Sequence, residues 1–180
     1  GAWIPMANEM GLTTVSPTVT SSDFTGKDDQ FFRVCSTTRE YAHASAEFHM
    51  RRAASRQFAL VRDDSNAAYT RSWAQHFSDR VVALGGQVLH QAVYAGSNRA
   101  EGVAVALEQA LAYQPDALVM VANARDTALL AQLLRKQGSA LPLLAAEWAA
   151  TDQLLALGGR SVEKLEVAQY FDPNSSQAAY

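Results

Sequence analysis

The feature that most constrains the fold is an alternation of short β-prone runs and amphipathic helical stretches, which continues from Phe58 almost to the end of the chain. Apolar residues recur with helical spacing between the runs. Strands that alternate with helices of this length specify a parallel sheet covered by helices on both faces. The sequence therefore predicts an α/β fold with an open, doubly wound, Rossmann-like parallel sheet. The predicted strands are residues 58–63, 87–94, 117–123, 141–147 and 165–171.

The predicted helices carry clear apolar stripes. The first stripe repeats every fourth residue, which places its members on one helical face, and it consists of Tyr69, Trp73, Phe77 and Val81. A second stripe, closed by Gly138 as a predicted C-cap, consists of Leu129, Leu130, Leu133 and Leu134.

The first 35 residues do not follow this alternation. Residues 3–11 are typical of the end of a helix, and residues 12–16 are predicted to form one more strand. A polar loop, an extended run at 31–35 and a helix that begins within 36–40 follow. A single helix and strand ahead of a complete five-stranded unit indicate a piece of a second lobe.

Composition and charge exclude several classes of protein. With 15 Lys and Arg against 18 Asp and Glu, the net charge is −3, whereas nucleic-acid binding needs a basic face. Cys35 is the one cysteine, so an intramolecular disulfide is excluded. The first ten residues lack the basic start and apolar stretch of a signal peptide. For an exported protein, we therefore expect the signal peptide to lie outside this chain.

Motifs for catalysis and for cofactors are missing from the sequence. It contains no G-x-G-x-x-G, no phosphate-binding G-x-x-x-x-G-K-[ST] and no G-x-S-x-G nucleophile motif. The four histidines are scattered, so no metal-ligand set is predicted. We therefore expect neither an enzyme nor a bound cofactor or metal.

Ligands of open α/β sheets bind beyond the carboxyl ends of the strands. Tyr69 follows the first predicted strand, Asn123 and Asp126 follow the third, and Glu147 and Trp148 follow the fourth. Polar and aromatic groups at these ends suit a small amphipathic ligand.

Each candidate also has a purely structural interpretation. Glu147 could occupy the first turn of the next helix, where acids are favoured, and Tyr69 could pack in the core. Trp148 could cover the edge of a cleft, and Asp126 could open a helix.

Four segments, in order, resemble the type I periplasmic solute-binding proteins, in particular the branched-chain amino-acid and amide receptors of ABC transporters. They are "LTTVSPTVTSSDFTGKDDQFFRV", "VRDDSNAAYTRSW", "PDALVMVANARDTALLAQLLRKQG" and "PLLAAEWAATDQLLALGG". The resemblance implies that residues 1–35 are a remnant of the N-terminal lobe with the first crossover. It implies the C-terminal lobe at 36–168, and a second crossover with the start of a truncated helix at 169–180.

The family's binding residues carry over to positions of this chain. Its S-P-x-x-T loop implies that Thr18 and Thr20, with Ser16 as a weaker candidate, hold the ligand carboxylate. Its strand-end tyrosine implies Tyr69, and its carboxylate after the fourth strand implies that Glu147 pairs with the ligand ammonium. A zwitterion needs a partner for each of its charges when it is buried. Trp148 is expected to stack on the ligand, and Asn123 and Asp126 are weaker candidates.

The resemblance implies an extracytoplasmic, periplasmic protein that binds a small amino acid or amide reversibly and delivers it to the membrane permease of an ABC importer. The alternative is a sensory ectodomain of the same fold in a membrane receptor kinase or cyclase. Family members are about twice as long, so we also expect self-association through apolar surface that the missing lobe would cover.

Overall fold

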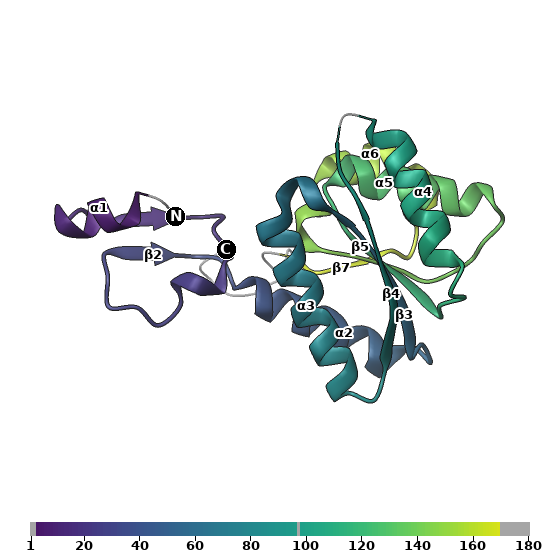
Figure 1. The fold of residues 1–180 in the computed structure, drawn as a ribbon, viewed down its shortest axis with the longest axis horizontal. Coiled ribbons are helices and arrows are strands. Elements are labelled where there is room, and N and C mark those ends of the chain that lie inside the picture. Colours follow the sequence, from purple (N-terminus) through teal and green to yellow (C-terminus); the bar gives the residue numbers. More distant parts are fainter. Residues whose placement is uncertain (1–2, 97, 170–180) are drawn as a thin grey trace, which may run out of the picture.

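The larger part of the molecule is a five-stranded parallel sheet in the order β4-β3-β5-β6-β7 (Figure 1). The computed structural model describes residues 3–96 and 98–169. All five predicted strands are present, and the last three are shorter than predicted. Pro142 has no N–H to donate to a ladder, and the chain turns into a 3-10 helix at Glu147. The strands are β3 (Gln57–Asp63), β4 (Gln87–Tyr94), β5 (Ala117–Val121), β6 (Leu143–Ala145) and β7 (Glu166–Val167).

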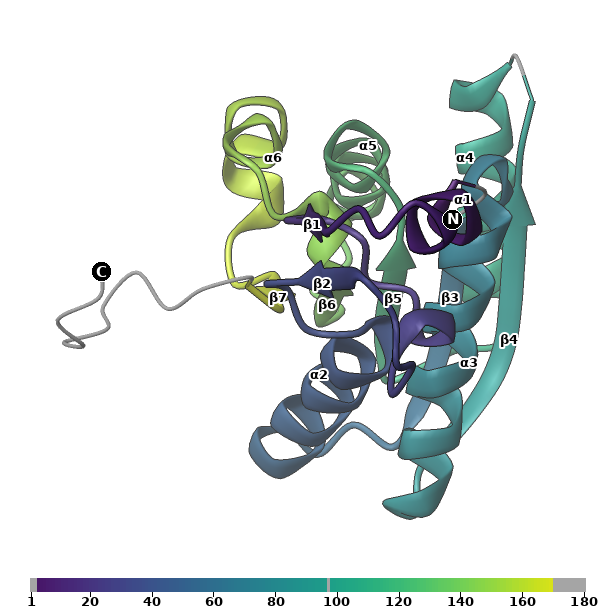
Figure 2. The same ribbon diagram turned by 90° about the vertical axis from the view of Figure 1, so that its left-hand side faces the viewer.

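Helices cover both faces of this sheet, as Figure 2 shows. Helices α2 and α3 pack on one face, and α4, α5 and α6 pack on the other. Strand β3 shows the cause, because alternate residues point to opposite faces. Phe58 and Leu60 join the core under α2 and α3, whereas Ala59 and Val61 join the other core. The helices are α2 (Thr38–Arg52), α3 (Ala67–Ala83), α4 (Arg99–Leu111), α5 (Ala124–Lys136) and α6 (Asp152–Gly158).

The predicted helical stripes form the inner faces of α3 and α5. Trp73, Phe77 and Val81 are fully buried, whereas Tyr69, at the start of the same stripe, is only partly buried. In α5, Leu130 and Leu134 are buried and their two stripe neighbours are partly buried. Gly138 follows α5 with a φ of 75°, the left-handed conformation predicted for a helix C-cap.

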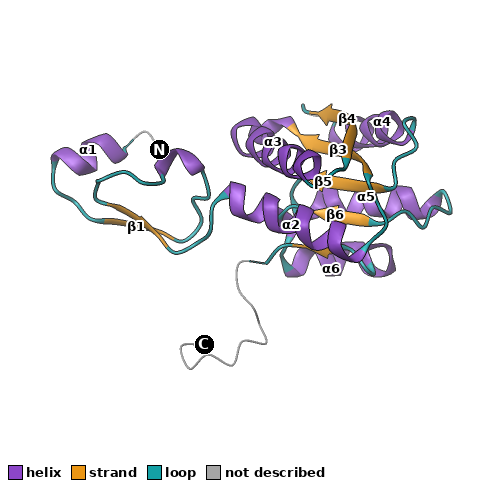
Figure 3. Cartoon of the chain, turned by 90° about the horizontal axis from the view of Figure 1, so that it is seen from below, coloured by secondary structure: helices purple, strands orange, loops and turns teal. Residues whose placement is uncertain are grey.

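A smaller part stands away from the lobe, and Figure 3 shows it as a separate unit. It contains α1 (Ile4–Glu9), the 3-10 helix η1 (Ser22–Phe24) and a parallel pair, β1 (Thr14–Ser16) with β2 (Phe31–Arg33). Helix α2 begins with a capping box: the Thr37 side chain accepts the backbone N–H of Glu40, and the Glu40 carboxylate accepts the backbone N–H of Thr37. This confirms the predicted helix start.

The three-part division of the chain stays a prediction. The expected second crossover at 169–180 lies almost entirely outside the described residues. No helix within residues 3–96 and 98–169 is long and apolar enough to cross a membrane.

Candidate functional site

A cavity of about 750 Å³ lies where the N-terminal segment meets the lobe. Four of the five principal predicted site residues line it, and they come from segments far apart in the sequence. The loop after β1 supplies one group, the start of α3 another, and the turn after β6 a third. The lining residues are Thr18, Val19, Thr20, Ser21, Asp23, Thr38, Asn66, Ala68, Tyr69, Ser72 and Trp148.

The loop after β1 is shaped by a serine hydroxyl. Ser16 Oγ accepts hydrogen bonds from the backbone N–H of Thr18 at 3.3 Å and of Val19 at 3.1 Å. Ser16 does not line the cavity. It folds the loop that presents Thr18 and Thr20, so its contribution is to the shape of this wall.

Thr20 is tied to the first turn of α2. The backbone N–H of Thr38 donates to the Thr20 carbonyl at 2.7 Å, and the two threonine hydroxyls are 3.0 Å apart. The N-terminal end of this 15-residue helix therefore faces the same wall. Helix N-termini favour anions because their N–H dipoles point outward. Arg33 adds a cation nearby, since it donates to the Ser21 carbonyl at 2.6 Å. The wall thus offers threonine hydroxyls to a ligand, with one acidic residue, Asp23, beside them.

The second wall is aromatic. The rings of Tyr69 and Trp148 meet edge to face, with centroids 5.7 Å apart and planes at 81°. Tyr69 lies in the first turn of α3, and Trp148 lies in the 3-10 helix η3 (Glu147–Ala149) that follows β6. Both side chains are half-buried and line the cavity.

Glu147 lies directly behind this aromatic wall, with 1% of its surface exposed. Its two carboxylate oxygens accept different donors: Tyr69 Oη donates to Oε1 at 2.7 Å, and Trp73 Nε1 donates to Oε2 at 2.8 Å. Burial raises the pKa of Glu147, while the hydrogen bonds from Tyr69 and Trp73 lower it. The predicted carboxylate is therefore at the site, one hydrogen bond behind a residue that lines the cavity.

The two remaining weaker candidates, Asn123 and Asp126, lie outside the cavity. Asn123 caps α5 by accepting the backbone N–H of Asp126 at 3.0 Å. Asp126 is buried, accepts the Tyr94 hydroxyl at 2.9 Å and pairs with Arg99. Arg99 also pairs with the fully buried Asp63. These residues join the carboxyl ends of β3 and β4 to α4 and α5, and the structure gives them a stabilising role.

The sequence interpretation missed Trp73, which it placed only in an apolar stripe. One signal was available: Tyr69 and Trp73 are four residues apart, so their polar tips lie on the same helical face. A buried indole N–H needs an acceptor. The interpretation also missed several polar lining residues, which have no distinguishing pattern: Ser21, Asp23, Thr38 and Ser72.

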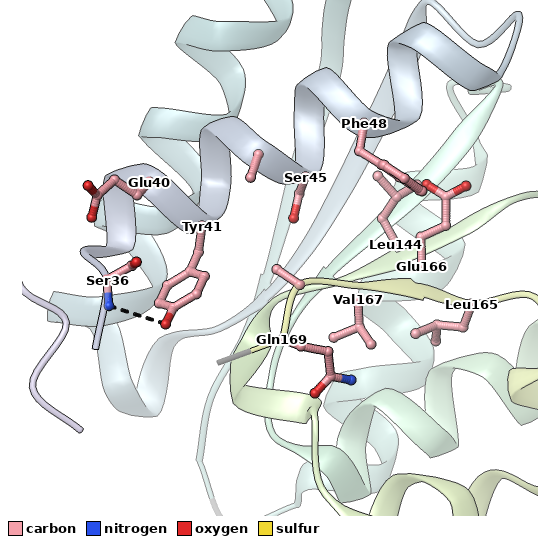
Figure 4. A pocket seen from close by; sticks show the side chains of 12 residues that line it. Ser36, Glu40, Tyr41, Ser45, Phe48, Leu144, Leu165, Glu166, Val167 and Gln169 are labelled. Carbon is pink, nitrogen blue, oxygen red and sulfur yellow. Dashed lines mark hydrogen bonds between the residues drawn. The ribbon is translucent and has the colours of Figure 1, made fainter. Parts of the chain in front are cut away.

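A second cavity, of about 620 Å³, lies between α2 and the edge strand β7 (Figure 4). Figure 4 shows Phe48 of α2 beside Leu144 and Glu166. Leu165 and Val167 lie on the other side of β7, where they pack against the core under α4, α5 and α6. On its border, the Glu166 carboxylate pairs with His49 at 2.8 Å. None of the predicted site residues lines this cavity, so we place the candidate site in the first one. In the described part of the chain, no group of three His, Cys, Asp or Glu residues could hold a metal ion.

The structure thus combines a doubly wound lobe with a separate strand pair, and a cavity lies at their junction. The chain belongs to the periplasmic binding protein family, whose model matches residues 1–180. Its fold is that of a lobe of the type I members of this family.

Solved structures agree on the fold. A leucine binding protein from Thermotoga maritima matches with a TM-score of 0.85 at 23% identity, over 97% of this chain and 49% of its own. A putative branched-chain amino acid ABC transporter from Rhodospirillum rubrum matches with a TM-score of 0.74 at 24% identity, over 96% and 48%.

A branched chain amino acid ABC transporter from Thermus thermophilus, solved with bound valine, matches with a TM-score of 0.77 at 20% identity, over 91% of this chain and 42% of its own. The chain thus spans about half the length of these structures. A search of curated proteins by sequence finds no significant match.

Proposed function

We propose that this chain is part of an extracytoplasmic solute-binding protein that reversibly binds a small amino acid or amide and delivers it to the permease of an ABC importer. One observation carries the proposal. Thr18 and Thr20 from the N-terminal segment, and Tyr69 and Trp148 from the lobe, line one cavity with the buried carboxylate of Glu147 behind it.

The two walls match the two ends of a zwitterion. The hydroxyls of Thr18 and Thr20, at the positive end of α2, suit the ligand carboxylate. Tyr69 Oη and the charge of Glu147 suit the ammonium, because a buried cation needs an anion close by. The Trp148 ring suits the aliphatic part of the ligand. No catalytic step is proposed: the ligand is held by closure of two lobes about their crossovers and is released on opening.

The comparisons support transport over the sensory alternative. The similar structures named above include a leucine binding protein and a transporter protein with bound valine. Because the chain spans about half of each, delivery to a permease and location outside the cytoplasm are proposed for the whole protein.

A thermal-shift screen with the twenty amino acids, small amides and urea tests the proposal. A ligand at a hundred times its dissociation constant adds about 2.7 kcal/mol to the free energy of unfolding, which moves the midpoint by several degrees in a chain of this size. We expect an amino acid to give this shift, and Glu147→Gln and Tyr69→Phe to lose it.

The matched control is Asp152→Asn, which removes an exposed carboxylate from the first turn of α6. This variant should keep the full shift. A panel without any shift would contradict the proposal. A shift that survives in both site variants would contradict the roles of Glu147 and Tyr69.

A further inference from the structure

We propose that Trp73 is a positioning residue of the ligand site: its indole N–H holds the Glu147 carboxylate in the orientation and charge state that the ligand ammonium requires. Trp73 is fully buried and does not line the cavity, and its Nε1 lies 2.8 Å from Glu147 Oε2. The inference rests on the proposed function, because it takes Glu147 to be the partner of the ammonium.

Two donors on one helix determine the orientation of the carboxylate. Tyr69 and Trp73 are one turn apart on α3, and each donates to a different oxygen of Glu147. Oε2 is thereby directed into the core, and Oε1 is directed toward Tyr69, which lines the cavity. A carboxylate held at one oxygen can rotate, whereas one held at both cannot. Trp73 therefore keeps Oε1 turned toward Tyr69, the residue through which Glu147 reaches the cavity.

Packing alone does not account for a tryptophan at this position. Its ring stacks on Phe77, with centroids 5.3 Å apart and planes at 12°. A phenylalanine would serve such a stack. The feature that phenylalanine lacks is the indole N–H, a donor that needs an acceptor when it is buried. Glu147 is that acceptor.

The indole also helps to keep Glu147 ionised. Burial raises the pKa of Glu147, and the hydrogen bonds from Tyr69 and Trp73 oppose this rise. Other titratable groups face the carboxylate from packed elements: Tyr69 from α3, and Tyr41 from α2, whose pKa is raised mainly by burial and in smaller part by the charge of Glu147. Without the indole N–H, the proton would be held more tightly, and the ammonium would lose its anion at a higher pH.

The first test needs no ligand. The side-chain carboxyl carbon of Glu147, labelled with ¹³C and assigned with Glu147→Gln, is titrated by NMR in the wild type and in Trp73→Phe. Loss of a hydrogen bond to a charged group should raise the titration midpoint by on the order of one pH unit. An unchanged midpoint would overturn the proposal.

Phe77→Leu is the matched control. Phe77 is fully buried on the same face of α3 and stacks on Trp73, but it has no polar atom. This variant should lower the melting temperature and leave the Glu147 midpoint in place. If Phe77→Leu moves the midpoint as far as Trp73→Phe does, the effect is one of packing and the proposal is wrong.

A measurement on the wild-type protein keeps the proposal testable if Trp73→Phe does not fold. The indole ¹H–¹⁵N signal of Trp73 should move with pH through the Glu147 midpoint, and this movement should disappear in Glu147→Gln. An indole signal whose position does not change as Glu147 titrates would overturn the proposal even if Trp73→Phe is insoluble.

The ligand measurement uses L-leucine and L-valine as probes. For a displacement of one pH unit, the weakening of probe binding in Trp73→Phe should be roughly tenfold greater below both midpoints than far above them, where only the lost orientation acts. Phe77→Leu should follow the wild-type pH profile. An affinity that matches the wild type at every pH would refute the positioning role. Failure of the wild type to bind either probe would count against leucine and valine as ligands, while the two NMR results still decide the role of Trp73.

Discussion

Replacing Arg99 with methionine tests the polar network at the carboxyl ends of the strands. Arg99 is the cation between two buried carboxylates, Asp63 and Asp126, whose side chains are 0% and 4% exposed. Methionine keeps the apolar stem and removes the charge. The variant would leave two buried anions facing each other without a counter-ion.

The structure bounds the size of the effect. Removing one partner of a buried ion pair typically costs about 3–5 kcal/mol, because the remaining charge is uncompensated. The Arg99 side chain is 34% exposed, so water screens part of this interaction. We therefore expect Arg99→Met to lower the free energy of unfolding by about 2–3 kcal/mol. This corresponds to a drop of roughly 4–12 °C in melting temperature for a chain of this size.

Urea denaturation followed by circular dichroism measures the loss, with Arg71→Met as the matched control. Arg71 also pairs with an aspartate, Asp64, but its side chain is 63% exposed, so its removal should cost less than about 1 kcal/mol. Equal effects of the two substitutions would refute the reasoning, as would a loss below about 1 kcal/mol for Arg99→Met.

The reasoning also predicts a rescue. Asp126→Asn in the Arg99→Met background removes one of the two uncompensated charges. The asparagine side-chain oxygen can still accept the Tyr94 hydroxyl, which lies 2.9 Å from Asp126 Oδ2. The double variant should recover part of the lost stability, because residues in one network do not contribute additively. A double variant less stable than Arg99→Met would contradict the account.

Three further predictions concern stability and association. Thr37→Ala removes the cap of α2 and should cost about 1 kcal/mol in urea denaturation. The backbone N–H of Thr37 lowers the pKa of Glu40, so the stability that Glu40 contributes is present above its ordinary value of 4.5 and is lost below it. Thr37→Ala keeps this backbone N–H and loses only the second cause, the side-chain hydrogen bond with Thr37, so its difference from the wild type should narrow only slightly in acid. A variant as stable as the wild type at neutral pH would contradict the cap. Gly86→Ala should cost about 1–3 kcal/mol, because the new methyl would lie 2.8 Å from Val81 Cγ1; an unchanged denaturation midpoint would show that the site relaxes. Phe32 is 55% exposed on the small sheet, so sedimentation should show self-association that Phe32→Lys weakens. A clean monomer of the wild type at high concentration would refute this.

Local sequence patterns were sufficient for most of the fold. The stripe from Tyr69 to Val81 predicted α3 because a period near four residues puts every member on one face. The run from Gln87 to Tyr94 predicted β4 with the observed bounds. Strand ends were less accurate where short strands leave the sheet, as at β6 and β7.

The sequence also indicated which residues could form the site. Thr18 and Thr20 were implied by the resemblance to the family, and Tyr69 and Trp148 were predicted at strand ends; these four line one cavity. Asn123 and Asp126 were predicted by the same rule and lie outside it, because the capping of α5 and the pairing with Arg99 engage them. Position at a strand end is a local property of the sequence, whereas access to the cavity depends on the side chains that surround the residue in the folded protein.

Only the tertiary structure decided the environment of Glu147. Its donors are 78 and 74 residues away in the sequence. No local pattern reports which side chains will meet across such separations, since the packing of β6 against α3 determines it. Burial disfavours the charged form of Glu147, and the hydrogen bonds from Tyr69 and Trp73 partly offset this cost. The position of Glu147 after β6 was therefore predictable from the sequence, but its charge environment follows from the packing of the lobe.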